Sequence, residues 1–215
     1  MAMVEWRAST PAGIELLAEF LQRYPGITLD AQVLAGDVVI DEVDVDLIVI
    51  HGAEPVSQRQ VRTLGSLDLV LCASPAYLAR RGPPEDATAL AKDDFVLCDL
   101  FDWQLYAPPS LREVIPEIRL VTNETSLARQ LALESMGVTW LPQLIVARHI
   151  QQGLLVQVLP DQVGSLPLWM VTPRGKEVNR RIEVLEACIR ARAMQSAPWN
   201  YQGGGGSGRS GMLVN

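Results

Sequence analysis

Two short apolar segments constrain the fold of this chain more than any other feature of the sequence. Asp46–Ile50 reads DLIVI and Leu67–Cys72 reads LDLVLC. Apolar runs of this length, rich in β-branched residues, are typical of strands covered on both faces, as in a parallel sheet. Ser74 and Pro75 follow, and a capping serine before a proline predicts a helix that begins near Ala76. We therefore expect strands and helices to alternate.

The same alternation is predicted along the whole chain. Strands are expected at residues 4–8, 27–33 and 46–50, with a helix at 14–23 after the first strand. Because strand-helix-strand crossovers are right-handed, these elements predict a parallel sheet with its loops at one edge. After a connection at Val61–Gly65, a second unit of the same kind begins at the strand Leu67–Cys72. A last strand at 168–172 and a helix at 177–194 follow the turn region Pro160–Pro167.

Composition narrows the class of protein. The chain has 215 residues, 48% of them hydrophobic, which is enough for a sizeable core. Its 18 Lys and Arg against 25 Asp and Glu give a net charge of -7, and no basic cluster occurs, so direct DNA binding is disfavoured. Neither a long apolar segment nor a signal-peptide pattern is present. We expect a cytoplasmic protein that makes no contact with a membrane.

Motifs for catalysis and for metal binding are missing from the sequence. It contains no G-x-S-x-G, H-E-x-x-H, P-loop or G-x-G-x-x-G pattern, and its histidines are His51 and His149. The acidic run at residues 41–46 lacks histidine or cysteine partners, which favours a solvated face. Cys72, Cys98 and Cys188 are widely spaced among apolar residues, which predicts buried free thiols. We expect neither an enzyme nor a cofactor or metal.

Several segments resemble the effector-binding domain of LysR-type transcriptional regulators. These segments occur in the order typical of that family: LAEFLQRYP at 17–25, DLIVIHG at 46–52, LVLCASPAYLARRGPP at 69–84, LALESMGVTWLP at 131–142, and LLVQVLP at 154–160 followed by LWMVTP at 168–173. The individual segments are unspecific, but their order is specific. The winged helix-turn-helix of the family is absent, so we expect a regulatory fragment or a protein that has lost its DNA-binding domain.

The resemblance implies an α/β fold of the type 2 periplasmic-binding-protein kind. It consists of two Rossmann-like subdomains with a hinge of two crossovers. Residues 1–62 and 167–198 would form subdomain I, and residues 63–166 would form subdomain II. Residues 199–215 include GGGGSG, a flexible linker composition of the kind added for expression, and are excluded from the fold.

The resemblance also implies the function. The chain would sense a small-molecule effector, with carboxylates and aromatic acids as candidate classes, and would form a homodimer through Ile14–Arg23 and Ile27–Val33. The full-length regulator could form a tetramer, and DNA would be bound only through the absent N-terminal domain. A stand-alone solute-binding protein of the periplasmic type is the alternative, since it shares the two-lobed architecture. A small α/β enzyme of unknown chemistry is a third reading.

Candidate effector contacts come from loops that follow predicted strands, where open α/β sheets bind ligands. The residues are Ser9, Thr10, His51, Gly52, Thr63, Phe101, Trp103, Asn123, Glu124 and Thr125. Each has a structural alternative: helix capping for the hydroxyl-rich loops, hinge geometry for Thr63, and packing for the aromatic residues. Ile50 stands where the family often has arginine. We therefore expect hydroxyls and backbone N–H groups to hold the effector.

Overall fold

The described part of the chain forms one mixed sheet flanked by helices. The computed structural model describes residues 2–6, 11–32, 39–100, 102–173 and 180–195. Its strands are β1 (Ala2–Trp6), β2 (Leu29–Gln32), β3 (Leu47–His51), β4 (Gln60–Ala73), β5 (Asp94–Cys98), β6 (Glu117–Thr122), β7 (Val138–Pro142), β8 (Val156–Val158) and β9 (Gly164–Thr172). Their order in the sheet is β2-β1-β3-β9-β4-β7-β5-β6, and β8 pairs with β4.

Helices cover this sheet. They are α1 (Pro11–Arg23), α2 (Pro75–Arg81), α3 (Trp103–Tyr106), α4 (Pro109–Arg112), α5 (Thr125–Leu133), α6 (Gln143–Gln151) and α7 (Arg180–Gln195), with short 3-10 turns η1 (Ile40–Glu42) and η2 (Thr88–Lys92). The predicted helix at 14–23 and the helix predicted to begin near Ala76 are confirmed. Ser74 caps α2 as expected, because its hydroxyl accepts a hydrogen bond from the Tyr77 N–H at 3.2 Å.

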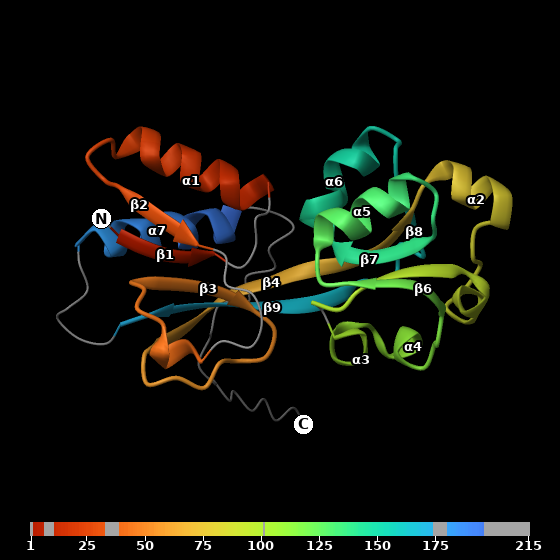
Figure 1. The fold of residues 1–215 in the computed structure, drawn as a ribbon, viewed down its shortest axis with the longest axis horizontal. Coiled ribbons are helices and arrows are strands. Elements are labelled where there is room, and N and C mark those ends of the chain that lie inside the picture. The colour runs from red at the N-terminus through yellow and green to blue at the C-terminus, as the bar shows by residue number, and fades with distance from the viewer. Residues whose placement is uncertain (1, 7–10, 33–38, 101, 174–179, 196–215) are drawn as a thin grey trace, which may run out of the picture.

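Two long strands, β4 and β9, connect the halves of the molecule (Figure 1). They pair antiparallel from Gln60 with Thr172 to Leu69 with Gly164. In Figure 1, β1 to β3, α1 and α7 lie at one end of these strands, and β5 to β8 with α2 to α6 lie at the other. The predicted α/β fold with two crossovers is confirmed.

The directions and lengths of the central strands differ from the prediction. β1 runs parallel to β2 and β3, and β5 runs parallel to β6 and β7. The run Leu67–Cys72, however, lies in β4, which is antiparallel to β7, β8 and β9. Coverage on both faces makes a strand apolar whatever its direction. The predicted connection Val61–Gly65 is part of β4, and β9 begins within the predicted turn region Pro160–Pro167.

In the first half, the main core lies between the sheet and the helices α1 and α7. Leu47 and Val49 of β3 share this core with Leu16 and Phe20 of α1 and with residues 182, 185 and 189 of α7. Ile48, between them in sequence, faces the other side and packs in a small cluster with Val45 and Val171, as the alternation of a strand requires. β3 is therefore covered on both faces.

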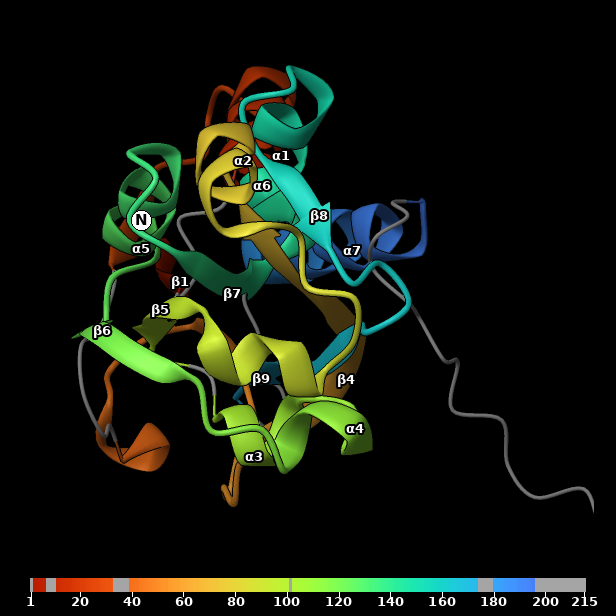
Figure 2. The same cartoon turned by 90° about the vertical axis from the view of Figure 1, so that its right-hand side faces the viewer.

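In the second half, α5 and α6 lie on one face of the sheet and α3 and α4 on the other (Figures 1 and 2). Cys72 and Cys98 are buried free thiols, as predicted, while Cys188 is half-buried. Burial raises the pKa of Cys72 to about 12 and that of Cys98 to about 11, so both remain thiols at neutral pH. These side chains are part of the core.

Candidate functional site

The carboxyl end of β3 lies at the junction of the two halves and is tied there by hydrogen bonds. Gly52, the residue after β3, is buried and has a φ of +107°, a conformation that favours glycine. Its N–H donates to the Pro167 carbonyl at 2.9 Å, and its own carbonyl accepts from the Trp169 indole N–H at 2.9 Å. His51, half-buried, pairs with Leu168 of β9. This end of β3 is therefore positioned by β9.

A tyrosine from the second half reaches the same segment. The Tyr106 hydroxyl, at the end of α3, lies beside Gly52 and is close enough to the Ala53 N–H for this group to affect its pKa. A Cβ placed on Gly52 would lie 3.3 Å from this hydroxyl oxygen. Burial raises the pKa of Tyr106, the negative charge of Asp102 adds to the effect, and the Ala53 N–H opposes it. The Tyr106 side chain is thus a neutral polar link between the halves.

Thr63 lies on β4 at a bulge. The register with β9 passes from Thr63 and Trp169 to Gly65 and Leu168, which leaves Leu64 as an extra residue. The exposed Thr63 side chain accepts a hydrogen bond from the Gly65 N–H at 3.2 Å, and Gly65 has a φ of +118°. The Thr63 hydroxyl thus stabilises the bulge, and its role as an effector contact stays a prediction.

The loop between β6 and α5 contains Asn123, Glu124 and Thr125. Asn123 and Glu124 are exposed, and Thr125 is half-buried. The Glu124 carboxylate caps α5: it accepts hydrogen bonds from the N–H groups of Ser126 at 3.1 Å and Leu127 at 2.9 Å. The Ser126 N–H is the main cause of the lowered pKa of Glu124. The free N–H groups predicted for this loop therefore already have an anionic partner.

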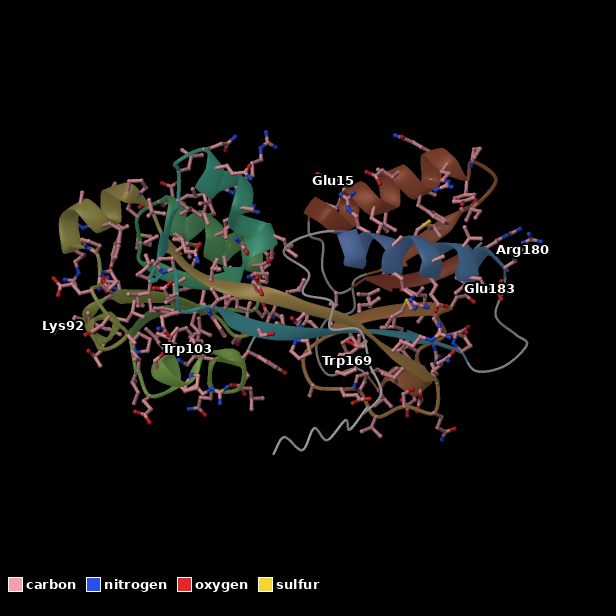
Figure 3. All side chains as sticks on the ribbon, turned by 180° about the vertical axis from the view of Figure 1, so that it is seen from behind. Glu15, Lys92, Trp103, Trp169, Arg180 and Glu183 are labelled. Carbon is pink, nitrogen blue, oxygen red and sulfur yellow. The ribbon has the colours of Figure 1, made fainter. Side chains whose placement is uncertain are left out.

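Trp103 packs into the core of the second half. Its ring meets Phe95 and Trp140 edge-on, with centroids 5.4 and 4.8 Å apart, and its indole N–H donates to the Leu111 carbonyl at 3.0 Å. Figure 3 shows Trp103 and Trp169 well apart, in different parts of the molecule. Packing thus accounts for the indole of Trp103. Ser9, Thr10 and Phe101 lie outside the described residues.

The structure brings together His51, Gly52 and Thr63 along the β3, β9 and β4 strands, because His51 pairs with Leu168, which also pairs with Gly65. It adds two residues that the site prediction missed. One is Trp169, in the predicted last strand, which is half-buried and donates its indole N–H to the Gly52 carbonyl. The other is Tyr106, which lies in the same aromatic segment as Phe101 and Trp103. Its aromatic side chain was the signal in the sequence that could have identified it as a site residue.

No group of three or more His, Cys, Asp and Glu side chains is placed to hold a metal ion in the described part of the chain. None of the helices in the described ranges combines the length and the apolar content needed to cross a membrane.

Comparison with protein families decides the classification. Residues 13–194 match the family model described as LysR substrate binding domain. The chain belongs to this family. The resemblance noted in the sequence is therefore confirmed.

Individual relatives agree. The chain is 29% identical over 177 residues to the HTH-type transcriptional activator AaeR of Escherichia coli (strain K12), a match that covers 79% of this chain and 57% of AaeR. It is 26% identical over 183 residues to the transcriptional activator TtdR of the same strain, covering 80% of this chain and 56% of TtdR. The chain thus spans a little over half the length of these curated relatives.

Solved structures show the same fold. CrgA, a LysR-type transcriptional regulator from Neisseria meningitidis, superimposes with a TM-score of 0.74 at 24% identity, over 89% of this chain and 68% of CrgA. The regulatory domain of AphB from Vibrio vulnificus gives a TM-score of 0.72 at 22% identity, over 89% of this chain and 97% of that domain. The domain is of the effector-sensing regulatory class. A stand-alone solute-binding protein is not favoured, and the relatives are transcriptional regulators rather than enzymes.

Proposed function

We propose that this domain binds its effector between the two halves, beside the carboxyl end of β3. The observation that carries the proposal is the close approach of the Tyr106 hydroxyl, from the second half, to Gly52 at the end of β3. Residues from both halves meet there, at the end of a strand where open α/β sheets bind ligands. The site would include His51, Gly52, Thr63 and the loop Asn123–Thr125. Ser9, Thr10, Phe101 and Trp103 stay predictions from the sequence.

The effector would act by shifting a population of conformations. A ligand that contacts both halves binds most tightly at one relative angle, and it stabilises that angle by its difference in affinity for the two arrangements. In the full regulator this angle would alter the spacing of the DNA-binding domains. The moving parts would be subdomain I (1–62 and 167–198) and subdomain II (63–166). A small carboxylate or aromatic acid is the proposed class, held by hydroxyl and N–H groups.

A thermal-shift screen tests the site. Metabolite carboxylates, aromatic acids and amino acids are added to the chain, and a ligand at 100 times its Kd should stabilise it by about 2.7 kcal/mol. Asn123→Ala should weaken binding of a hit by roughly fivefold, the cost of one neutral hydrogen bond of about 1 kcal/mol. Glu183→Gln, on the distant helix α7 (Figure 3), should leave binding unchanged. A hit that binds Asn123→Ala as tightly as the wild type would contradict the proposed position of the effector site.

We also propose that the domain forms a homodimer in which α1 and β2 of one copy pack on α5 and β6 of the other. β2 and β6 are the two ends of the sheet order, and each has one strand neighbour within that order. Both regions carry exposed apolar side chains: Leu21 of α1 is 40% exposed and Val121 of β6 is 53% exposed. In a dimer with two-fold symmetry this contact would occur twice, so both regions of both copies would be buried.

Sedimentation velocity tests the dimer. The wild-type chain should sediment as a dimer, and Leu21→Glu or Val121→Glu should each shift it to the monomer, because a carboxylate would be buried in an apolar contact. Val56→Glu is the matched control, since Val56 is 99% exposed and lies in the segment between β3 and β4, outside α1, β2, α5 and β6. A wild-type chain that stays monomeric at high concentration would refute the proposal.

A further inference from the structure

The loop between β6 and α5 carries its own anion. The carboxylate of Glu124 bonds to the N–H groups of Ser126 and Leu127, and it also accepts from the Ser126 hydroxyl at 2.8 Å. These N–H groups belong to the first turn of α5, where the helix has no internal acceptors for them. The positive end of the helix dipole is therefore already matched by a negative charge.

The position of the carboxylate is itself held by the loop. The Glu124 N–H donates to the Thr122 hydroxyl at 3.1 Å, and Thr122 is buried at the end of β6. The Thr122 carbonyl in turn accepts from the Asp99 N–H at 2.9 Å, which connects the loop to the segment after β5. A residue fixed in this way competes with any incoming anion as an intramolecular ligand, at a high effective concentration.

The neighbouring charges add to this effect. Both Asp99 and Glu124 lie close enough to Cys98 that their negative charges contribute to its raised pKa. Arg129, one turn further along α5, attracts Glu124 and is among the causes of its lowered pKa. The positive charge of Arg129 thus stabilises the Glu124 carboxylate, while Asp99 adds a second negative charge close to the loop. An anionic group approaching α5 would meet repulsion as well as occupied donors.

We infer that Glu124 is a specificity-determining residue that excludes negatively charged groups from the α5 end of the effector site. This inference rests on the proposed function, since it concerns the same site. The acidic group of a carboxylate effector would then be held at the other side of the site, and the part of the effector that reaches Glu124 carries no negative charge.

Anion titration tests the inference without a known effector. Sodium sulfate is added to ¹⁵N-labelled chain, and the amide signals of Ser126 and Leu127 are followed by NMR at constant ionic strength. In the wild type these signals should not respond to sulfate in a saturable way. In Glu124→Ala they should, with an apparent affinity at least tenfold higher than in the wild type, because the two N–H groups have lost their partner.

A matched variant separates the loss of the cap from the loss of a charge. Glu134→Ala, at the other end of α5, removes an exposed carboxylate that accepts only a side-chain hydrogen bond, from Gln130 at 3.0 Å. It should behave as the wild type. Saturable sulfate binding at Ser126 in the wild type, or none in a folded Glu124→Ala chain, would overturn the inference. Failure of the effector screen alone would instead count against the proposed function, so the two outcomes are distinguishable.

Discussion

Gly164, the first residue of β9, is a closely packed glycine in the second half of the molecule. A Cβ at this position would lie 2.4 Å from Cζ2 of Trp140 and 2.6 Å from the Tyr106 carbonyl oxygen. The Trp140 ring is 1% exposed and in edge-on contact with Trp103, and the carbonyl is backbone. Neither atom can move without disturbing the core.

Gly164→Ala should therefore destabilise the domain by about 1–3 kcal/mol, the usual cost of overpacking. For a domain of this size each kcal/mol lowers Tm by about 2–4 °C. Thermal or urea unfolding measures the change. Gly26→Ala is the control, because nothing lies within 4 Å of a Cβ there. Equal stability of the two variants would show that the core around Trp140 accommodates a methyl group.

The positions of residues at strand ends and helix caps were predictable from the sequence. The partners that such residues contact from distant parts of the chain were not. The position of His51 and Gly52 after a buried strand was enough to place them at the strand end, and Ser74 before Pro75 was enough to identify a cap. The Tyr106 contact with Ala53 joins residues far apart in sequence. Local patterns report burial and capping, whereas such a contact depends on how the two halves pack.

At the scale of elements, the cap of α5 depends on pH. The pKa of Glu124 is lowered below its usual 4.5, first by the Ser126 N–H. A carboxyl group whose pKa is lowered by folding stabilises the fold above its unfolded pKa, and this contribution is lost as the pH falls through the folded pKa.

Glu124→Ala should accordingly lower stability by about 0.5–2 kcal/mol near pH 7, the typical cost of losing an N-cap. The difference from the wild type should shrink as the pH falls below about 4.5, where the carboxylate becomes protonated. Urea unfolding of both proteins between pH 3 and 7 measures it. A difference that stays constant over this range would mean that the charge of Glu124 contributes nothing to the cap.

The elements themselves were predicted in order but not in length. The apolar run Leu67–Cys72 marks only the end of β4 that is buried on both faces, while the part from Gln60 to Ser66 carries exposed and half-buried side chains apart from Leu64. That part is a strand because β9 pairs with it, and pairing leaves no trace in the hydrophobic pattern. For the same reason Pro167, typical of a turn, lies inside β9.

At the scale of the whole molecule, the polar link between the halves is open to a direct test. Tyr106→Phe removes the hydroxyl that lies near the Ala53 N–H and leaves the ring in place. A neutral hydrogen bond contributes about 1 kcal/mol, so amide hydrogen exchange at Ala53 should become roughly fivefold faster. NMR-detected exchange measures this rate.

Tyr24→Phe serves as the comparison for this experiment. Tyr24 lies after α1, where its ring packs on Phe20 with centroids 5.0 Å apart. Removal of the Tyr24 hydroxyl should not alter hydrogen exchange at the Ala53 amide. Unchanged exchange at Ala53 in Tyr106→Phe would show that the amide is protected by something other than this hydroxyl, and the proposed site would lose its main support.

The bulge in β4 has a mechanical consequence. β4 and β9 are paired on both sides of the bulge, so the two halves are joined by a two-stranded ribbon and not by two independent linkers. A change in the angle between the halves would therefore twist this ribbon. The surplus residue in that ribbon is Leu64, and it is 1% exposed within the main core. Rotation of one half therefore has an axis that passes through packed side chains, which favours a few discrete angles over a continuous range.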